Sequence, residues 1–337
     1  MLRDTLRALG VAIGAMEPGP ANSIADVPGV RVGHHTRITG EGPLRVGEGP
    51  VRTGVTAVVP PGDGPWAAAV HVINGYGKSL GLMQVEELGE LESPVLLTNT
   101  LSVGAVQQGY LEWVREGGAF HPGRSRNVVV GECNDGYLND LWGLHVRPSD
   151  VPLALADAAR ATAVVQGAVG AGTGMVAFGH KGGVGSASRR LPGGGVLGAL
   201  VLANCGRPEE LRVGGRPLPP PAAGDGPPAP SPPPGSIIIV LATDARLDTL
   251  PLVRAARRAT HGLARTGAVS DPGSGDVVVA FSTAQASPAP LDALFRAVVE
   301  STEEAVLNAL STAETTTGRD GRTAWAVSHD RLRALAR

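Results

Sequence analysis

One short stretch of this 337-residue chain holds ten of its 28 prolines, and an apolar run follows it abruptly. Proline has no backbone N–H and fixes φ, so such a stretch cannot enter the interior of a sheet or helix. We therefore expect residues 216–235 to form an exposed, extended linker. The residues after it, from Ser236 to Ala242, predict a buried strand. The prolines are Pro217, Pro219, Pro220, Pro221, Pro227, Pro228, Pro230, Pro232, Pro233 and Pro234.

Composition and charge exclude several classes of protein. Apolar residues make up 42% of the chain, enough for a full core. A net charge of -2 argues against a protein built mainly to bind nucleic acid. No unbroken apolar run approaches the roughly 18–20 residues of a membrane-spanning helix. Cys133 and Cys205 cannot form a disulfide framework or a zinc site by themselves. We expect a cytoplasmic protein without a metal or cofactor, and with neither nucleic acid nor membrane as partner.

Alternating strand and helix patterns predict a mixed α/β fold. Short apolar runs bounded by Gly, Pro or polar residues are typical of strands covered on both faces. Such strands are expected at 55–59, 95–98, 128–131, 196–203, 236–242 and 277–281. Helices are expected at 79–91, 102–115, 149–163, 250–265 and 291–309. Residues 173–188 are rich in glycine and predict a hairpin. We expect layers of sheet covered by helices in a single catalytic domain over 1–337.

The junction between Gly235 and Ser236 has a specific chemical interpretation. A serine hydroxyl can attack the carbonyl carbon of the preceding peptide bond, and hydrolysis of the resulting ester cuts the chain. Glycine before the serine lowers the steric barrier to that attack. The cut would leave Ser236 with a free α-amine, whose reference pKa of roughly 7.7–8.0 lets it act as base for its own hydroxyl. The alternative is a linker that ends at an ordinary strand beginning with serine.

At this junction and elsewhere, the sequence resembles a known peptidase family. The segment 235–245 looks like that of the P1 peptidases, which include L-aminopeptidase/D-amino-acid esterases and β-peptidyl aminopeptidases; nylon-oligomer endoamidases are similar. The resemblance implies a four-layer α/β/β/α sandwich like that of N-terminal nucleophile hydrolases. It also implies self-cleavage into chains 1–235 and 236–337, and homo-oligomers of such units. Further blocks follow in family order at 22–34, 74–87, 131–140, 178–189, 203–206 and 318–321.

The resemblance implies roles for three residues near the expected nucleophile. Ser274 and Asp276 match a block whose serine and acid contact the nucleophile's amine and hydroxyl. A carboxylate beside an amine would hold it and tune its pKa. Asn204 matches an oxyanion donor, and removing such a donor costs roughly 2.7–4 kcal/mol of transition-state stabilisation. Each residue has a simpler explanation, because serine, aspartate and asparagine beside glycine are common in turns.

The segment 132–137 follows a predicted strand end, where ligand sites gather in layered α/β folds. It resembles the family's pocket-lining block, and we expect Glu132 to pair with the ammonium group of a substrate. Asn134 and Tyr137 are expected to bind substrate beside it. An aromatic hydroxyl in this block assists some family members, and either Tyr137 or the position of Asn134 corresponds to it. Lys181 either places positive charge near the oxyanion or decorates the hairpin.

Together these features predict a self-processing serine aminopeptidase or amidase-esterase. It would release N-terminal residues from short peptides, amino-acid amides or esters. Two alternatives keep the same nucleophile: an endoamidase on amide oligomers and an acyltransferase. A non-enzymatic alternative makes the proline-rich segment an extended ligand for an aromatic-lined groove. Phosphate binding at 75–79 is disfavoured, because Val72 stands where that motif needs glycine.

Overall fold

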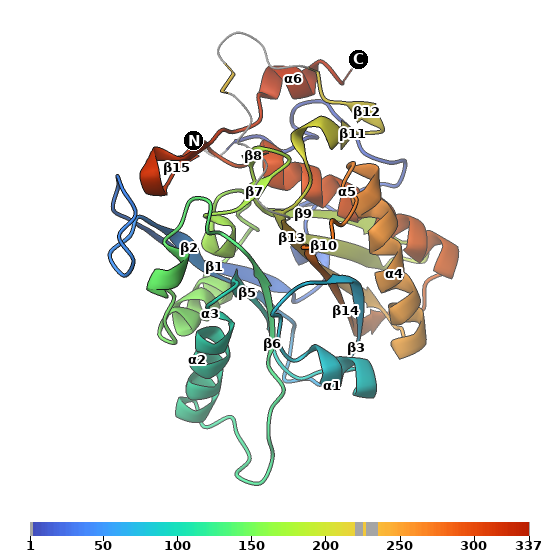
Figure 1. The fold of residues 1–337 in the computed structure, drawn as a ribbon. Helices are drawn as coiled ribbons and strands as arrows, with labels where there is room; N and C mark the ends of the chain where they lie inside the picture. Colours follow the sequence, from blue (N-terminus) through green and yellow to red (C-terminus); the bar gives the residue numbers. More distant parts are fainter. Residues whose placement is uncertain (1–2, 220–224, 227–234, 337) are drawn as a thin grey trace.

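The chain folds into two β-sheets packed face to face, each covered on its outer side by helices (Figure 1). The computed structural model describes residues 3–219, 225–226 and 235–336. The predicted α/β/β/α sandwich is thereby confirmed. Most of the predicted linker 216–235 lies outside the described residues. At its start, β12 (Arg216–Pro217) is exposed and pairs with β11 (Arg212–Val213) in a two-stranded hairpin.

The larger sheet has six strands, and its two central strands come from the end of the chain. The parallel strands β13 (Ser236–Ala245) and β14 (Gly275–Ala286) lie at its centre, and all other neighbouring strands in this sheet are antiparallel. Both central strands follow residue 235, whereas the four flanking strands precede it. The order is β4 (Glu90–Leu91), β3 (Trp66–Gly75), β14 (Gly275–Ala286), β13 (Ser236–Ala245), β10 (Val196–Asn204) and β9 (Gly183–Arg190).

The smaller sheet packs against the inner face of the larger one. Its four strands are β1 (Arg31–Thr39), β2 (Val51–Val59), β5 (Val95–Asn99) and β6 (Val129–Cys133), in that order. Alternate residues of β13 point to opposite faces: Ile238 joins the cluster between the sheets, whereas Ile237 and Ile239 join the cluster under the helices. Because both faces are covered, the strand is apolar from Ile237 to Ala242, as the sequence predicted.

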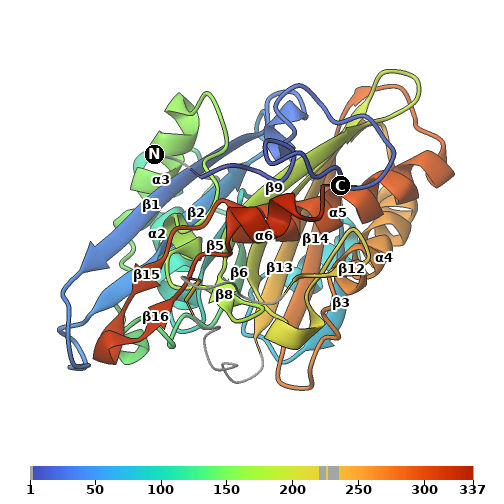
Figure 2. The ribbon, with the colours of Figure 1, turned by 90° about the horizontal axis from the view of Figure 1, so that it is seen from above.

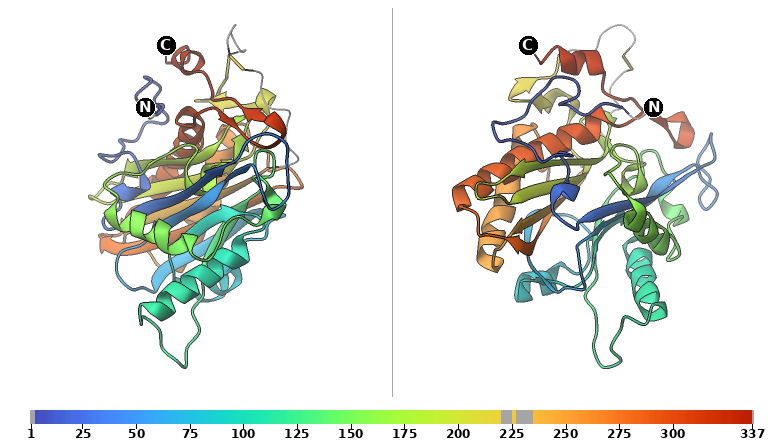
Figure 3. Two further views of the ribbon diagram at one scale, coloured as in Figure 1. Left: turned by 90° about the vertical axis from the view of Figure 1, so that its left-hand side faces the viewer. Right: turned by 180° about the vertical axis from the view of Figure 1, so that it is seen from behind.

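Helices close the two outer faces, as Figures 2 and 3 show from three further directions. The larger sheet is covered by α4 (Thr249–Arg265) and α5 (Leu291–Ser311), and the smaller by α2 (Val103–Glu116) and α3 (Asp150–Arg160). The helix predicted over 79–91 is wrong in its bounds. It shrinks to α1 (Leu82–Leu88), because Gly81 and Gly89 adopt positive φ at its ends and the next two residues form β4.

Short elements complete the fold. The expected hairpin over 173–188 splits, since β7 (Val176–Ala177) pairs with β8 (His180–Lys181), whereas β9 joins the six-stranded sheet. In the part of the chain that the structure describes, no helix combines the length and apolarity needed to cross a membrane. The remaining elements are β7 (Val176–Ala177), β8 (His180–Lys181), β15 (Thr316–Thr317), β16 (Thr323–Ala324), α6 (His329–Arg333) and the 3₁₀ turns η1 (Ile24–Asp26), η2 (Leu141–Gly143), η3 (Gly170–Gly172), η4 (Pro208–Glu210) and η5 (Arg319–Gly321).

A buried charge network joins the N-terminal segment to α5. The fully buried Arg189 contacts Glu300 at 3.0 Å and Glu304 at 2.6 Å. The backbone N–H groups of Ala15 and Met16 also donate to Glu300, at 3.1 and 2.9 Å. Burial alone would raise the pKa of Glu300, but these N–H groups and the Arg189 guanidinium outweigh it and lower the pKa.

Candidate active site

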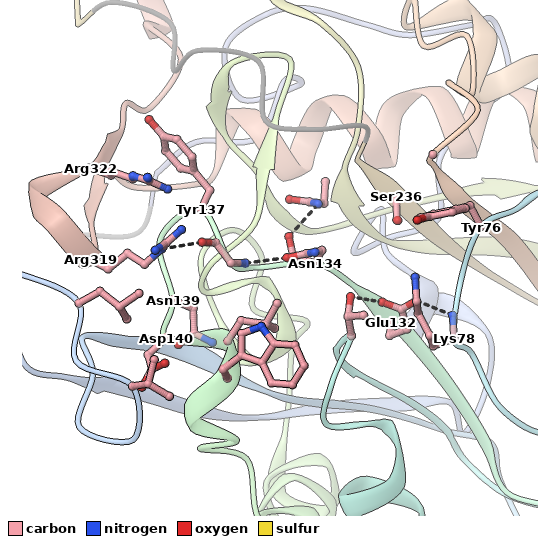
Figure 4. Close-up of a pocket in the computed structure, with 18 residues that line it drawn as sticks. Tyr76, Lys78, Glu132, Asn134, Tyr137, Asn139, Asp140, Ser236, Arg319 and Arg322 are labelled. Atoms are coloured by element: carbon pink, nitrogen blue, oxygen red, sulfur yellow. Dashed lines mark hydrogen bonds between the residues drawn. The ribbon is translucent and has the colours of Figure 1, made fainter.

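Ser236 begins β13 at the edge of a cavity of about 530 Å³ (Figure 4). That volume is typical of small-molecule sites. The side chain is 7% exposed, and its Oγ accepts a hydrogen bond of 3.1 Å from the backbone N–H of Gly275. The serine that follows the proline-rich segment is therefore not on an open surface. It combines a nearly buried strand position with access to a ligand-sized space.

Asn204 ends β10 and lies directly across from Ser236 in the antiparallel pair. Its Oδ1 accepts from the backbone N–H of Val176 at 2.9 Å, and its Nδ2 donates to the carbonyl of Asn134 at 3.1 Å. These two bonds fix which end of the amide is the donor. The amide nitrogen carries two hydrogens, and Asn134 takes one of them. Asn204 also lines the cavity, so the second hydrogen suits a developing oxyanion.

Ser274 and Asp276 lie behind Ser236, buried rather than lining the cavity. Asp276 sits beside Ile237 in the parallel pair of β13 and β14. Its Oδ1 accepts from Ser274 Oγ at 2.5 Å and from the backbone N–H of Ile237 at 3.1 Å. Burial raises the pKa of Asp276, and hydrogen bonds from Ser270 and Ser274 oppose the rise. The structure thus brings Ser236, Ser274 and Asp276 together.

Glu132 lies near the end of β6 and lines the cavity on the same side as Ser236 (Figure 4). Its Oε1 accepts from the backbone N–H of Lys78 at 2.7 Å, and its Oε2 accepts from the Thr100 hydroxyl. The side chain is 2% exposed. Both oxygens are therefore held in place by neutral donors, which leaves the negative charge for a cationic ligand. No local motif pointed to Thr100.

Asn134 and Tyr137 both line the cavity, as expected, but in different ways. Asn134 forms a turn, because its Oδ1 accepts from the backbone N–H of Gly136 at 2.9 Å. Tyr137 lies across the cavity from Ser236, and its ring packs beneath the guanidinium of Arg322, 5.4 Å from the ring centroid (Figure 4). In this arrangement, the Tyr137 hydroxyl does not face the expected nucleophile.

Lys181 is part of the interior rather than of the cavity wall. Its ammonium donates to the carbonyls of Gly172, Met175 and Gly182 at 2.9, 2.7 and 2.8 Å. Burial lowers the pKa of Lys181 to about 7. The ammonium group is therefore occupied in cross-linking loops beneath the site, and the side chain does not decorate a hairpin surface.

The two cysteines are free thiols in the core. Burial raises the pKa of the Cys133 thiol and that of the Cys205 thiol well above the ordinary value. A buried neutral thiol is a poor nucleophile. Within the described ranges, no group of three or more His, Cys, Asp or Glu residues is arranged to hold a metal ion.

Sequence reasoning missed the far wall of the cavity. Asp140 holds it together by accepting from the backbone N–H groups of Gly47 at 2.8 Å and Gly143 at 3.0 Å, and by contacting His145 at 2.8 Å. Asp140 and Arg319 fall in the family-like blocks 131–140 and 318–321, but the sequence did not assign them to the cavity, because the wall is built from turns far apart in the chain. The side chains of this wall are Leu44, Val46, Leu141, Trp142, Arg319 and Arg322.

Comparisons with known proteins agree on one kind of enzyme. The profile of peptidase family S58 matches residues 22–324. The beta-peptidyl aminopeptidase BapA of Sphingosinicella microcystinivorans is 40% identical over 98% of this chain and 91% of its own length. A Burkholderia beta-aminopeptidase structure has a TM-score of 0.88 at 39% identity, covering 98% of both chains. The L-aminopeptidase D-Ala-esterase/amidase of Ochrobactrum anthropi, described as a prototype serine aminopeptidase and a variant of the Ntn hydrolase fold, has a TM-score of 0.84 at 35% identity, covering 99% of this chain and 98% of its own.

Proposed function

The chain belongs to peptidase family S58, and we propose that its nucleophile is Ser236. Self-cleavage of the peptide bond after Gly235 would make this serine N-terminal. The protein is a serine aminopeptidase with an N-terminal nucleophile hydrolase fold. One observation supports Ser236 above all others: it opens a buried strand and lines the same cavity as Asn204 and Glu132. The endoamidase and acyltransferase alternatives are not favoured, because the named relatives are aminopeptidases.

The cleavage step moves the acyl group of Gly235 from nitrogen to oxygen. Ser236 Oγ attacks the carbonyl carbon of Gly235, the C–N bond breaks, and the hydroxyl proton passes to the released nitrogen. Water then hydrolyses the ester, which restores the hydroxyl and leaves a carboxylate on Gly235. The products are the chains 1–235 and 236–337, and the second begins with a free amine beside its own hydroxyl.

The same hydroxyl then serves the aminopeptidase reaction. The Ser236 amine takes the proton from Oγ as the oxygen attacks the carbonyl of the substrate's first residue. Asn204 Nδ2 donates to the oxyanion, since its orientation is already fixed by Val176 and Asn134. The proton passes to the leaving amine, and water hydrolyses the acyl-enzyme. Asp276 and Ser274, behind the nucleophile, hold the amine.

Glu132 gives the reaction its preference for chain ends. A peptide bond inside a long chain has no positive charge next to it, whereas an N-terminal residue carries an ammonium group. We assign that ammonium to the Glu132 carboxylate, whose two oxygens accept from the neutral backbone N–H of Lys78 and the Thr100 hydroxyl. By similarity to the beta-peptidyl aminopeptidases, we propose N-terminal β-residues as the preferred first residue. Comparing kcat/KM for β-alanyl and α-alanyl dipeptides tests this preference.

Intact mass spectrometry of purified protein tests the assignment of Ser236. The parent should split into fragments that begin at residues 1 and 236, whereas Ser236→Ala should stay whole and hydrolyse no dipeptide. Ser231→Ala, which changes the nearest preceding serine, should split like the parent. An active parent that remains uncut, or a Ser236→Ala protein that is cut and active, would falsify the proposal.

A further inference from the structure

The cavity carries opposite charges at its two ends. Glu132 lies on the side of Ser236, whereas Arg319 and Arg322 lie on the opposite side, beyond Asn134 (Figure 4). Two other charged residues line the cavity: Lys78, whose ammonium lies over the Tyr76 ring at 4.5 Å, and Asp140, whose oxygens contact Gly47, Gly143 and His145. Because these two already have partners, a ligand that spans the cavity meets the Glu132 carboxylate at one end and the arginine guanidinium groups at the other. This polarity matches a zwitterion whose ammonium and carboxylate groups are separated by the bond to be cut.

The two arginines are not equivalent. Arg319 donates from Nε to the carbonyl of Gly136 at 2.7 Å and has Asp320 at 3.5 Å, so much of its hydrogen-bonding capacity is used. Arg322 is exposed, and within the part of the chain that the structure describes its contact is with the Tyr137 ring. A guanidinium over an aromatic face keeps its N–H edge directed outward for an anion. Arg322 is thus the better carboxylate ligand.

Two large apolar side chains of the cavity lining face solvent. Trp142 is 71% exposed and Val46 is 65% exposed, and both line the cavity. Exposed apolar groups gathered at a concave site usually mark a surface that a ligand covers. An apolar side chain of a substrate would remove both from water. Such a side chain would lie beside the carboxylate that Arg322 attracts.

This wall is held rigidly before any ligand arrives. Asp140 ties the turn that carries Val46 to the 3₁₀ turn that carries Trp142, through the N–H groups of Gly47 and Gly143. Asp320 accepts from the backbone N–H of Leu44 at 2.9 Å. This bond connects the turn that carries Val46 to the segment that carries Arg319 and Arg322. A preorganised wall loses little entropy on binding, so even modest contacts can discriminate between substrates.

We infer that this wall is the subsite for the residue that leaves, and that it recognises an apolar residue with a free α-carboxylate. The inference rests on the proposed function, in which Glu132 holds the ammonium group and Ser236 attacks between the two ends. The substrate class it names is the dipeptide with an apolar second residue, in preference to the matching dipeptide amide. Trp142 and Val46 contact the side chain, and Arg322 pairs with the carboxylate.

The test compares β-alanyl-leucine with β-alanyl-leucinamide, using parent protein and Arg322→Gln. The parent should favour the free acid, and Arg322→Gln should raise KM for the acid about fivefold while changing kcat/KM for the amide less than twofold. Arg322→Lys should keep part of the preference, because it keeps the charge. Arg45→Gln is the matched control, since Arg45 lies on the same turn as Val46 but does not line the cavity.

A second readout separates this inference from the proposed function. Reduced-amide analogues of the two dipeptides, in which the scissile bond cannot be cut, are titrated by calorimetry. Tighter binding of the acid analogue to the parent, lost in Arg322→Gln, supports the subsite even if no turnover occurs; absent turnover would count against the proposed function alone. Equal binding of acid and amide by the parent, or an equal loss of both in Arg322→Gln, would overturn the subsite. Trp142→Ala should weaken the binding of the β-alanyl-leucine analogue more than the binding of the matching β-alanyl-serine analogue.

Discussion

Gly235 lies so close to the carbonyl of Asn204 that a Cβ at position 235 would sit 1.7 Å from the carbonyl oxygen. The same Cβ would be 2.7 Å from the carbonyl carbon and 3.1 Å from the Cα of Cys205. These are backbone atoms at the end of β10, and they cannot swing aside as a side chain can. Glycine is therefore required before Ser236 because of its small size.

Gly235→Ala should slow self-cleavage by about tenfold to a hundredfold. The new methyl group must push the junction away from Asn204, and such overpacking costs roughly 1–3 kcal/mol, enough to misplace the bond to be broken. A time course of intact mass after purification measures the rate. Gly104→Ala is the control, because a Cβ there meets no atom within 4 Å. Cleavage of Gly235→Ala at the parent's rate would contradict the prediction.

Asp276→Asn should lower kcat by about a hundredfold and move the acid limb of the pH–rate profile to lower pH. A carboxylate beside the Ser236 amine favours the ammonium form and raises the amine pKa. Without that charge the amine loses its proton at lower pH. The neutral amine that acts as base is therefore already present at a pH where the parent's amine is still protonated. Steady-state rates between pH 5 and 10 measure both effects. Asp292→Asn, which changes an exposed carboxylate in the first turn of α5, should leave the profile in place.

Glu300→Gln should lower the free energy of unfolding at pH 7 by about 2 kcal/mol, because it removes a buried partner of Arg189. The folded-state pKa of Glu300 is lowered, so its stabilisation is present above the unfolded-state pKa of about 4.3 and is lost as pH falls through the folded-state value. Urea unfolding should therefore show a difference between parent and variant that shrinks below pH 4. The exposed Glu116→Gln provides the control.

The fragments 1–235 and 236–337 should stay together after cleavage. Strands β13 and β14 of the second fragment lie between β10 and β3 of the first, with hydrogen-bonded neighbours on both sides. Size-exclusion chromatography should give one peak at the elution volume of uncut Ser236→Ala, and denaturant should split it into two. Two native peaks would show that the central strands do not hold the fragments.

The sequence predicted the core strands well, because strands covered on both faces are apolar runs, as over 196–203, 236–242 and 277–281. It missed β1, whose residues are largely polar, and β3, which is rich in alanine. Neither strand has a run of large apolar residues. Their place in a sheet depends on neighbours such as β2 and β14 that lie far away in sequence.

The predicted site residues came from single blocks, and the structure gathers five of them on one cavity: Ser236, Asn204, Glu132, Asn134 and Tyr137. Thr100 and Arg322 could not be predicted in the same way. A threonine that bonds Glu132 and an arginine that faces the cavity have no distinctive spacing, since only the tertiary fold brings them there.

The first segment of the chain packs against the last one, although the two ends do not meet (Figures 1 and 2). Arg3 donates to the carbonyl of Val327 at 2.5 Å, and a Cβ on Gly10 would meet that of Ala336 at 3.6 Å. A circularly permuted gene could join the native ends through a bridge long enough to span the distance between the N and C marks in Figures 1 and 2, and open the protein at codon 236. After removal of the initiator methionine, Ser236 would be the first residue of such a polypeptide without any self-cleavage. Its hydrolysis of substrates could then be measured independently of the cleavage step.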